Sequence, residues 1–173
     1  MPEIWDIYDR NRTFTGRTML RGEPMEEDAY HLVVSVWIRN SEGKWLLSRR
    51  AENKSHPLKW EPVGGSVLAG EDSLSGALRE VQEELGISLK KENGTLYTSF
   101  RREKISWENP GFLDIWYFEQ DISIDEIVLQ QEETCGAKWA SEAEILHMIE
   151  AGEFVPTKEF PYHEELFAWT NTR

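Results

Sequence analysis

The segment from Gly65 to Ile87 constrains the fold of this chain more than any other, because a glycine-containing turn leads there into a glutamate-rich helix. Asp72 or Ser73 can cap the start of this helix, and Gly86 stands where a left-handed residue commonly ends one. Apolar residues recur at helical spacing within it, at Leu74, Leu78, Val81 and Leu85. One face of the helix is therefore predicted to pack on a hydrophobic core.

Three glutamates, Glu80, Glu83 and Glu84, form a second face of the same helix. At about 100° per residue, Glu80 and Glu84 lie together roughly opposite the apolar face, with Glu83 beside them. We expect this side of the helix to be exposed. Carboxylates this close repel one another unless a cation lies between them, and oxygen ligands suit Mg²⁺ or Mn²⁺. A solvated acidic face without a metal ion is the alternative interpretation.

The spacing of the fixed residues in this segment resembles a known sequence signature. Five residues separate Gly65 from Glu71, seven separate Glu71 from Arg79, and R-E-V-Q-E-E-L-G-I follows from Arg79 to Ile87. This pattern resembles the signature of the Nudix hydrolases, G-x5-E-x7-R-E-U-x-E-E-x-G-U with U aliphatic, at every specified position. We call residues 65–87 the Nudix box. The resemblance implies a Nudix-type α/β/α sandwich around a mixed β-sheet.

The resemblance also implies an activity, the hydrolysis of a diphosphate linkage between a nucleoside or similar group and another moiety. A diphosphate is densely anionic, and divalent ions neutralise its charge and activate a water molecule. Glu80, Glu83 and Glu84 are implied to be catalytic residues and metal ligands for Mg²⁺ (or Mn²⁺). A backbone carbonyl at Gly64 or Gly65 is implied as a further metal ligand.

Other residues of the box are implied to support this site. Arg79, counted among the catalytic residues, is expected to orient Glu83 and the loop. Glu71 is expected to brace the loop against the helix, and Gly65 and Gly86 to give the loop and the helix end their shape.

Size and charge limit the classes of protein and partner. A chain of 173 residues is expected to form one domain. Its net charge of −13 disfavours duplex nucleic acid and anionic membranes as partners, whereas metal ions can still attract an anionic small molecule. The single cysteine, Cys135, excludes an internal disulfide. We therefore expect a cytoplasmic protein that acts on a small-molecule diphosphate, and a homodimer is compatible with the sequence.

Alternating and β-branched segments predict the strands. They are Glu3–Tyr8, Tyr30–Ile38, Lys44–Arg49, Trp60–Val63, Leu96–Ile105 and Phe112–Glu119, with a short addition at Ala137–Ala140. The second and third are expected to pair as a hairpin around residues 40–43, and the fifth and sixth as another. Residues 11–16 are expected to form a turn or loop, and residues 17–28 a polar surface segment.

Two further helices are predicted. A capping box at Ser141 opens one that runs to about Ala151, and a short one covers Tyr162–Trp169. Strands on both sides of a central helix give an α+β fold class. We expect one Nudix domain over residues 1–173 with its core at about 30–149, an N-terminal strand extension and a C-terminal helical segment.

Several residues outside the box are candidates for substrate binding. Arg49 and Arg50 end a strand near the expected anion site, and alternation allows at most one of them to reach it. Lys54 and His56 are weaker candidates. Core positions are expected for Trp60, Trp107 and Trp116. Stacking of these rings on a base of the substrate is the alternative. Cys135 is expected to be a bystander thiol.

The opening W-D-I-Y-D-x-N-R and the strand Y-H-L-V-V-S-V-W-I resemble a subgroup related to isopentenyl diphosphate isomerase. That isomerase needs a catalytic cysteine before the box, and this chain has no cysteine before Cys135. Isomerase-like activity is one alternative to hydrolysis, and the missing cysteine argues against it. A non-catalytic ligand-binding or regulatory module is the other, and the intact box argues against it.

One candidate carboxylate lies beyond the helix. Glu133 stands six residues before Trp139, which resembles the isomerase spacing between a glutamate and a tryptophan. We expect Glu133 to be a catalytic residue, as a general base or a further ligand. Glu132 is adjacent and could take its place, and an ordinary acidic loop is the alternative.

Overall fold

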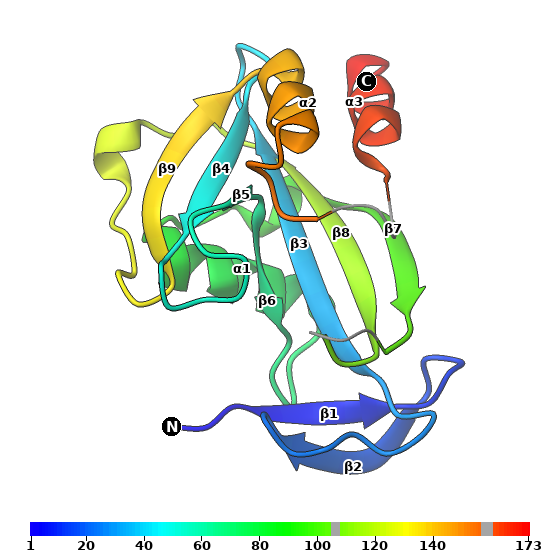
Figure 1. The fold of residues 1–173 in the computed structure, drawn as a ribbon. Coiled ribbons are helices and arrows are strands. Elements are labelled where there is room, and N and C mark those ends of the chain that lie inside the picture. The colour runs from blue at the N-terminus through cyan, green and yellow to red at the C-terminus, as the bar shows by residue number, and fades with distance from the viewer. Residues whose placement is uncertain (105–107, 157–160) are drawn as a thin grey trace.

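A computed structural model of the protein describes residues 1–104, 108–156 and 161–173 (Figure 1). Its elements, in chain order, are β1 (Ile4–Tyr8), β2 (Phe14–Leu20), β3 (His31–Arg39), β4 (Trp45–Arg50), β5 (Trp60–Glu61), β6 (Val63–Ser66), α1 (Ser73–Leu85), the 3₁₀ turn η1 (Lys91–Asn93), β7 (Gly94–Arg102), β8 (Gly111–Glu119), the 3₁₀ turn η2 (Ile124–Glu126), β9 (Thr134–Ala140), α2 (Glu142–Glu150) and α3 (His163–Asn171). None of the described helices is long and apolar enough to span a membrane.

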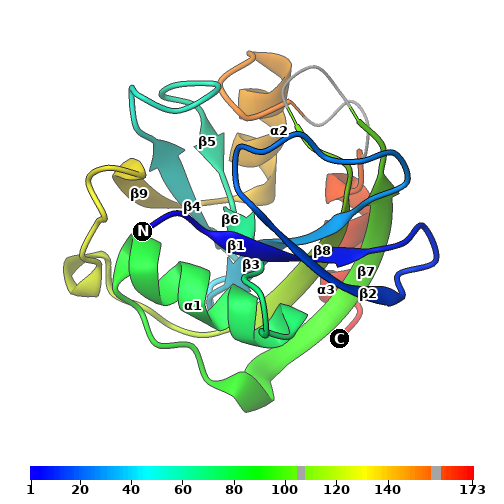
Figure 2. The same ribbon diagram turned by 90° about the horizontal axis from the view of Figure 1, so that it is seen from below.

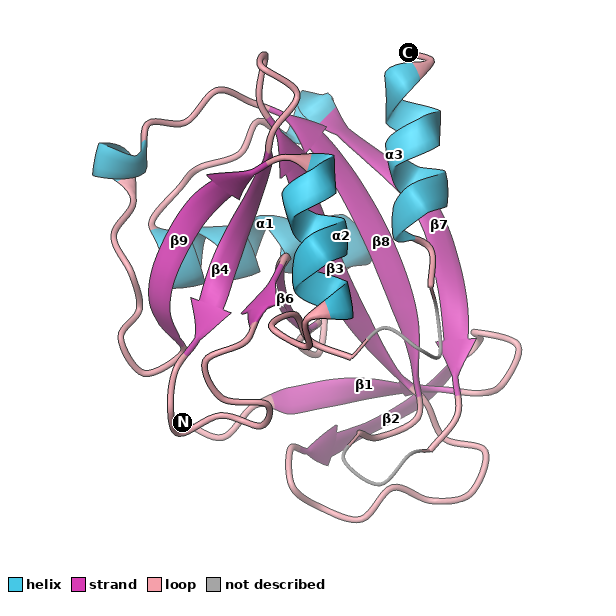
Figure 3. Cartoon of the chain, turned by 45° about the horizontal axis from the view of Figure 1, so that its top comes forward, coloured by secondary structure: helices cyan, strands magenta, loops and turns pink. Residues whose placement is uncertain are grey.

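The predicted α/β/α sandwich around a mixed sheet is confirmed. Seven strands form the sheet, in which β3 pairs with β8 in parallel and with β6 antiparallel. Helix α1 covers one face, and α2 and α3 cover the other (Figures 1 and 3). Strands β1 and β2 form a separate hairpin that crosses one end of the sheet, as the view from below shows (Figure 2).

The residues of β3 explain why both faces of the sheet are covered. Leu32, Val34 and Val36 alternate onto the α1 side, where they pack in a core with Val81 and Leu85. A second core on the other side of the sheet contains Trp37, Trp45, Ile115, Ile145, Leu166 and Phe167. Because α2 and α3 both supply residues to this second core, the C-terminal segment is part of the packed structure.

The caps of α1 are those that the sequence predicted. The Asp72 side chain accepts a hydrogen bond from the backbone N–H of Ser75 at 2.7 Å. Gly86 ends the helix with a φ of 68°, in the left-handed region that favours glycine. The capping box at Ser141, which opens α2, is confirmed as well.

The predicted hairpin between the strands now seen as β3 and β4 is wrong beyond its turn. The two strands pair only at Arg39 and Trp45, and β4 then pairs with β5 and β9. The reason is that β6 occupies the edge of β3 over Val33–Val36. The predicted pairing of β7 with β8 is confirmed, although Ile105, the predicted end of β7, lies outside the described residues.

Two strand boundaries also differ from prediction. Strand β2 covers Phe14–Leu20, which we expected to be partly a turn and partly a surface segment; nearly all of its residues are exposed, so it lacks the alternating pattern of a half-buried strand. The strand predicted at Trp60–Val63 is two short strands separated by Pro62. Proline has no N–H to donate to a sheet, which accounts for the interruption.

Candidate active site

A cleft with a volume of about 880 Å³ runs along β3, where His31, Val33, Val34 and Ser35 line it. Its walls come from the β1–β2 hairpin, the loop after β4, strand β6, helix α1 and the loop before β9. Residues of the Nudix box line it together with residues that are far away in the sequence. The fold thus brings residues of the box and candidates outside it, such as Glu133 and Arg50, into one cavity.

Arg79 is the centre of the hydrogen bonding in the box. Its five N–H groups donate to Glu71 at 2.8 and 3.1 Å, to the Ser66 carbonyl at 2.9 Å, to Glu80 at 2.9 Å and to Glu83 at 3.1 Å. All the donors of this guanidinium are therefore used within the protein. This arrangement agrees with a role in orienting the loop and Glu83 rather than in binding substrate.

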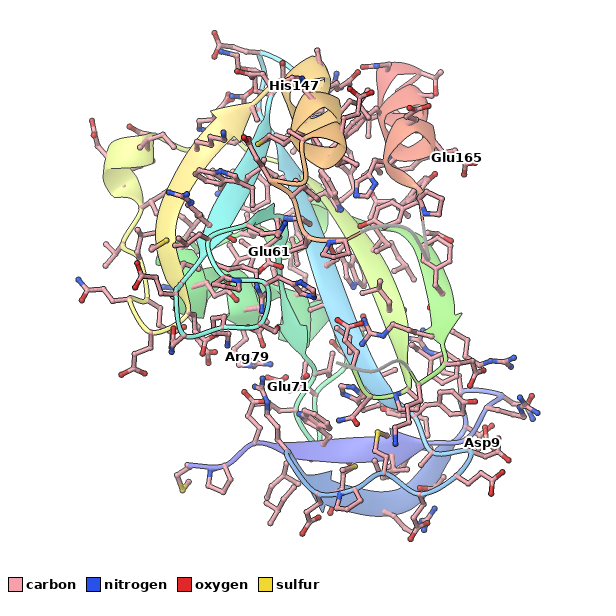
Figure 4. The ribbon with its side chains drawn as sticks, in the orientation of Figure 1. Asp9, Glu61, Glu71, Arg79, His147 and Glu165 are labelled. Atoms are coloured by element: carbon pink, nitrogen blue, oxygen red, sulfur yellow. The ribbon has the colours of Figure 1, made fainter. Side chains whose placement is uncertain are left out.

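Glu71 connects the same guanidinium to the turn before α1. Its second oxygen accepts a hydrogen bond from the backbone N–H of Leu68 at 3.0 Å. Glu71 and Arg79 lie close together where the loop meets the helix, with Glu61 on the other side of Arg79 (Figure 4). The carboxylate of Glu71 thus makes hydrogen bonds both to the loop and to the helix.

Glu80 and Glu84 do not lie on an exposed face, and that expectation is wrong. Their exposed fractions are 8% and 7%, because β6 and the loops around the cleft cover the side of α1 opposite its apolar face. Burial raises the pKa of Glu80 to about 7, although Arg79 opposes the shift. Glu83 is half exposed and lines the rim of the cleft.

Glu84 shares the cleft lining with three other carboxylates that lie near enough to shift its pKa. Burial raises the pKa of Glu84 well above its usual value, and the negative charges of Glu61, Glu80 and Glu133 raise it further. Glu61 makes an ion pair with Arg50 at 2.7 Å. The sequence analysis missed Glu61, and its only local signal was an acidic residue inside a short strand that leads into the box.

The donor set of this cluster fits a hard divalent cation. Its side chains offer only oxygen atoms as metal ligands. A bound cation would offset the repulsion among their negative charges. Within residues 1–104, 108–156 and 161–173, no three His, Cys, Asp or Glu residues already converge as a ligand group. Arg79 holds Glu80 and Glu83 by hydrogen bonds in this structure.

Gly65 faces Glu80 so closely that no side chain fits between them. A Cβ built on Gly65 would lie 2.3 to 2.5 Å from the carboxyl atoms of Glu80. Gly65→Ala should therefore push this carboxylate aside and lower kcat about a hundredfold, since small misplacements at a reacting centre cost that much. The melting temperature should change little, because the displaced atoms end a flexible side chain.

Gly136→Ala is the matched control for that substitution, since a Cβ there meets its nearest neighbour at an ordinary 3.5 Å. Steady-state kinetics and thermal unfolding of both variants provide the measurement. Equal activities for the two variants would contradict the role given to the contact between Gly65 and Glu80.

The two arginines predicted near the substrate separate as alternation requires. Arg50 lines the cleft and donates to Glu61 and to the carbonyl and hydroxyl of Ser55. Arg49 lies outside the cleft lining and donates to the Leu58 carbonyl at 2.9 Å. Only Arg50 is therefore placed to reach a phosphate in the cleft.

Lys54, His56 and Glu133 line the cleft, and Lys54 makes an ion pair with Glu133. His56 has a φ of 51°, a backbone conformation that non-glycine residues seldom adopt. Glu132 is exposed and does not belong to the cleft lining. The geometry thus separates Glu133 from its neighbour, which the sequence left open.

The remaining candidates lie elsewhere. Trp60 is covered by Lys138 and Arg49, and Trp116 donates from its ring nitrogen to the Ser73 hydroxyl at 2.8 Å. Neither tryptophan lines the cleft, and Trp107 lies outside the described residues. Cys135 is exposed and also lies outside the cleft lining.

The chain is similar to known proteins over most of its length. A sequence model of the NUDIX domain matches residues 29–168. An uncharacterized Nudix hydrolase of Listeria monocytogenes is 36% identical over 156 residues, which cover 89% of each chain. A crystal structure from Deinococcus radiodurans superposes with a TM-score of 0.72 at 24% identity, covering 96% of this chain and 98% of that one. A MutT protein from Methanosarcina mazei gives 0.66 at 28% identity, with 83% and 96% covered.

Proposed function

This chain belongs to the Nudix hydrolase family and is a hydrolase of diphosphate bonds in small molecules; we propose that it needs a divalent metal ion, Mg²⁺ or Mn²⁺, held by Glu80, Glu83 and Glu84. The observation that carries this proposal is the burial of Glu80 and Glu84 in a cleft wall shared with two further carboxylates. Such a concentration of negative charge is costly in a protein that binds no cation there. A backbone carbonyl at Gly65 is the further ligand that we propose.

Each residue then has a distinct task. The bound metal supplies neutralising charge and a water molecule of lowered pKa. Arg79 and Glu71 hold the loop, so that Glu80 keeps its place beside Gly65. Arg50, which lines the same cavity, binds a phosphate oxygen of the substrate once it leaves Ser55.

Hydrolysis is favoured over proton transfer at carbon by the position of the only thiol. Cys135 is outside the cleft lining, and no other cysteine is present to act as the acid. A non-catalytic sensor is disfavoured by the intact box, three glutamates of which line the cleft.

The test is a panel of diphosphates incubated with Mg²⁺, with phosphate release measured after coupling to a phosphatase. The panel contains nucleoside triphosphates, nucleotide sugars, dinucleoside polyphosphates and isoprenoid diphosphates. We expect turnover of at least one class, and chelation with EDTA should stop it. Turnover that persists unchanged in EDTA would refute the metal requirement.

Glu133 gives a second test within the same proposal. Glu133→Gln should lower kcat about a hundredfold with a small change in KM, because a general base acts in the chemical step. Glu132→Gln is the matched control and should be nearly neutral, since this exposed side chain is not part of the cleft lining. Steady-state kinetics on the best substrate decides between them. Small and equal effects would leave Glu133 as a partner of Lys54 only.

A further inference from the structure

Residues 51–58 form the loop between β4 and β5, which we call the lysine loop. The backbone N–H of Ala51 donates to the Glu133 carbonyl at 3.1 Å, so the loop begins beside the start of β9 (Figure 1). The segment that carries Glu133 is itself tied to α1, because the Gln130 N–H donates to the Glu84 carbonyl at 3.0 Å. The lysine loop, Glu133 and the end of α1 are therefore neighbours in space.

Lys54 brings a positive charge from this loop into the cleft. Residues 53–56 line the cavity, and the Lys54 ammonium makes an ion pair with the Glu133 carboxylate. The side chains of the two partners are 21% and 35% exposed, so solvent screens the pair only in part. Burial raises the pKa of both Glu61 and Glu84, and the Lys54 charge opposes the shift in each. One lysine thus offsets part of the negative charge that three glutamates share.

Arg50, the other cation on this side of the cleft, is held more firmly. Its guanidinium donates to Glu61 at 2.7 Å, to the Ser55 carbonyl at 2.6 Å and to the Ser55 hydroxyl at 2.9 Å. Arg50 belongs to β4, which pairs with β5 and β9. Lys54 belongs to a loop, and its ammonium can leave Glu133 without breaking any pairing in the sheet.

The backbone of the lysine loop is strained at its far end. His56 and Leu58 have φ values of 51° and 61°, in the left-handed region that residues other than glycine seldom adopt. Contacts at the base of the loop hold this conformation, including the hydrogen bond of 3.1 Å from the Leu58 N–H to the Arg50 carbonyl. Strained backbone persists only where surrounding contacts impose it, and the Lys54 ion pair is one of them. Loss of that pair favours a relaxed loop.

A divalent cation and the Lys54 ammonium compete for the same negative charge. A metal ion at Glu84 attracts the Glu133 carboxylate and repels the ammonium that is paired with it. The ion therefore binds more weakly while Lys54 keeps its place, and the apparent affinity falls with the fraction of molecules in the competent state. Departure of Lys54 removes the repulsion and releases the strain of the loop together.

We propose that Lys54 is an internal counter-ion of the metal site and that the lysine loop is a latch, which opens when Mg²⁺ or Mn²⁺ binds. Lys54 then sets the metal concentration at which the site fills. Filling of the site is coupled to the conformation of residues 51–58. This inference rests on the proposed metal-dependent hydrolysis and adds a means by which metal binding is regulated.

The first measurement is calorimetric titration of the protein with Mn²⁺ and with Mg²⁺, each without substrate. Lys54→Met keeps an unbranched apolar stem and removes the charge, so the dissociation constant for both ions should fall about tenfold. Lys54→Arg keeps the charge and should bind both ions within about twofold of the wild type.

Lys59→Met is the matched control. Lys59 stands at the other end of the lysine loop, donates to the Gly152 carbonyl and lies outside the cleft lining. Its removal changes the net charge of the protein by the same amount as Lys54→Met. Long-range attraction for the metal ion alone should alter the dissociation constant by less than about twofold, because salt screens it.

The second measurement is amide hydrogen exchange, read by mass spectrometry with and without Mg²⁺. Binding to the native state slows exchange in α1, whereas an opened latch makes residues 52–58 exchange about threefold faster or more. In Lys54→Met these loop amides should exchange fast even before the ion is added. The opposite signs in α1 and in the loop distinguish opening of the latch from general stabilisation.

The outcomes separate this inference from the proposed function. Equal metal affinities for Lys54→Met and Lys59→Met would overturn the latch, and so would loop exchange that is unchanged or slower with Mg²⁺. Metal binding by the wild type in either case leaves metal-dependent hydrolysis standing. Failure of both ions to bind the wild type and every variant would refute the metal requirement, and the latch with it.

Discussion

Replacing Glu84 with glutamine should abolish most of the hydrolysis and at the same time raise the melting temperature of the metal-free protein. Glu84 is 7% exposed, and three other carboxylates raise its pKa beyond the effect of burial. Removing a charge that acts in the transition state costs several hundredfold in kcat. Without a metal ion, the neutral amide avoids the desolvation and repulsion that the carboxylate suffers.

The opposite signs of the two effects make this prediction specific. Thermal unfolding in EDTA and steady-state kinetics in Mg²⁺ measure them on the same preparation. Added Mg²⁺ should raise the melting temperature of the wild type more than that of the variant, since the ion binds the native state. Glu150→Gln, an exposed substitution on α2, should show neither effect. Near wild-type turnover of the Glu84 variant would refute the assignment of this residue as a metal ligand.

Arg12→Met should destabilise the protein by about 3 kcal/mol, because it leaves a buried carboxylate without its cation. Arg12 lies in the turn between β1 and β2 and makes two hydrogen bonds of 2.6 Å to Asp114, which is fully buried. Burial alone would raise the pKa of Asp114, but hydrogen bonds from Arg12, Ser73 and Ser99 lower it. The carboxylate therefore stays charged inside the protein and depends on these donors.

The matched control is Arg17→Met, which removes an ion pair between two exposed side chains, Arg17 and Glu26. Such pairs contribute at most about 1 kcal/mol. Urea unfolding of both variants gives the comparison, and the double variant Arg12→Met with Asp114→Asn should recover part of the loss. Equal stabilities for the two single variants would show that the pair with Asp114 contributes no more than a surface contact.

The sequence predicted local features better than tertiary ones. Helix α1 and its caps depend on residues that are close together in the sequence, so their spacing alone was sufficient. The burial of Glu80 was missed because it depends on β6 and the cleft loops, which helical periodicity does not represent.

The parts of the cleft far from the box illustrate the same limit. In the sequence, His31 is one more position in a predicted strand. Its stacking on Trp5 is visible only in the folded structure. Strand β2 is exposed along its length and pairs only with β1, so it has no buried face to leave a pattern in the sequence. Both features arise from contacts that only the folded chain brings together.

The ion pair between Arg12 and Asp114 limits where this chain can be truncated without loss of stability. Ser73, the first residue of α1, donates to the same buried carboxylate, so the hairpin and helix α1 share one anchoring group. Opening of the hairpin therefore loosens the start of α1, and the two should exchange their amide hydrogens as one cooperative unit. A fragment that begins at residue 29, where the family domain begins, would retain the Asp114 charge and lose its cation. The boundary of the sequence family is thus not a boundary of the folding unit.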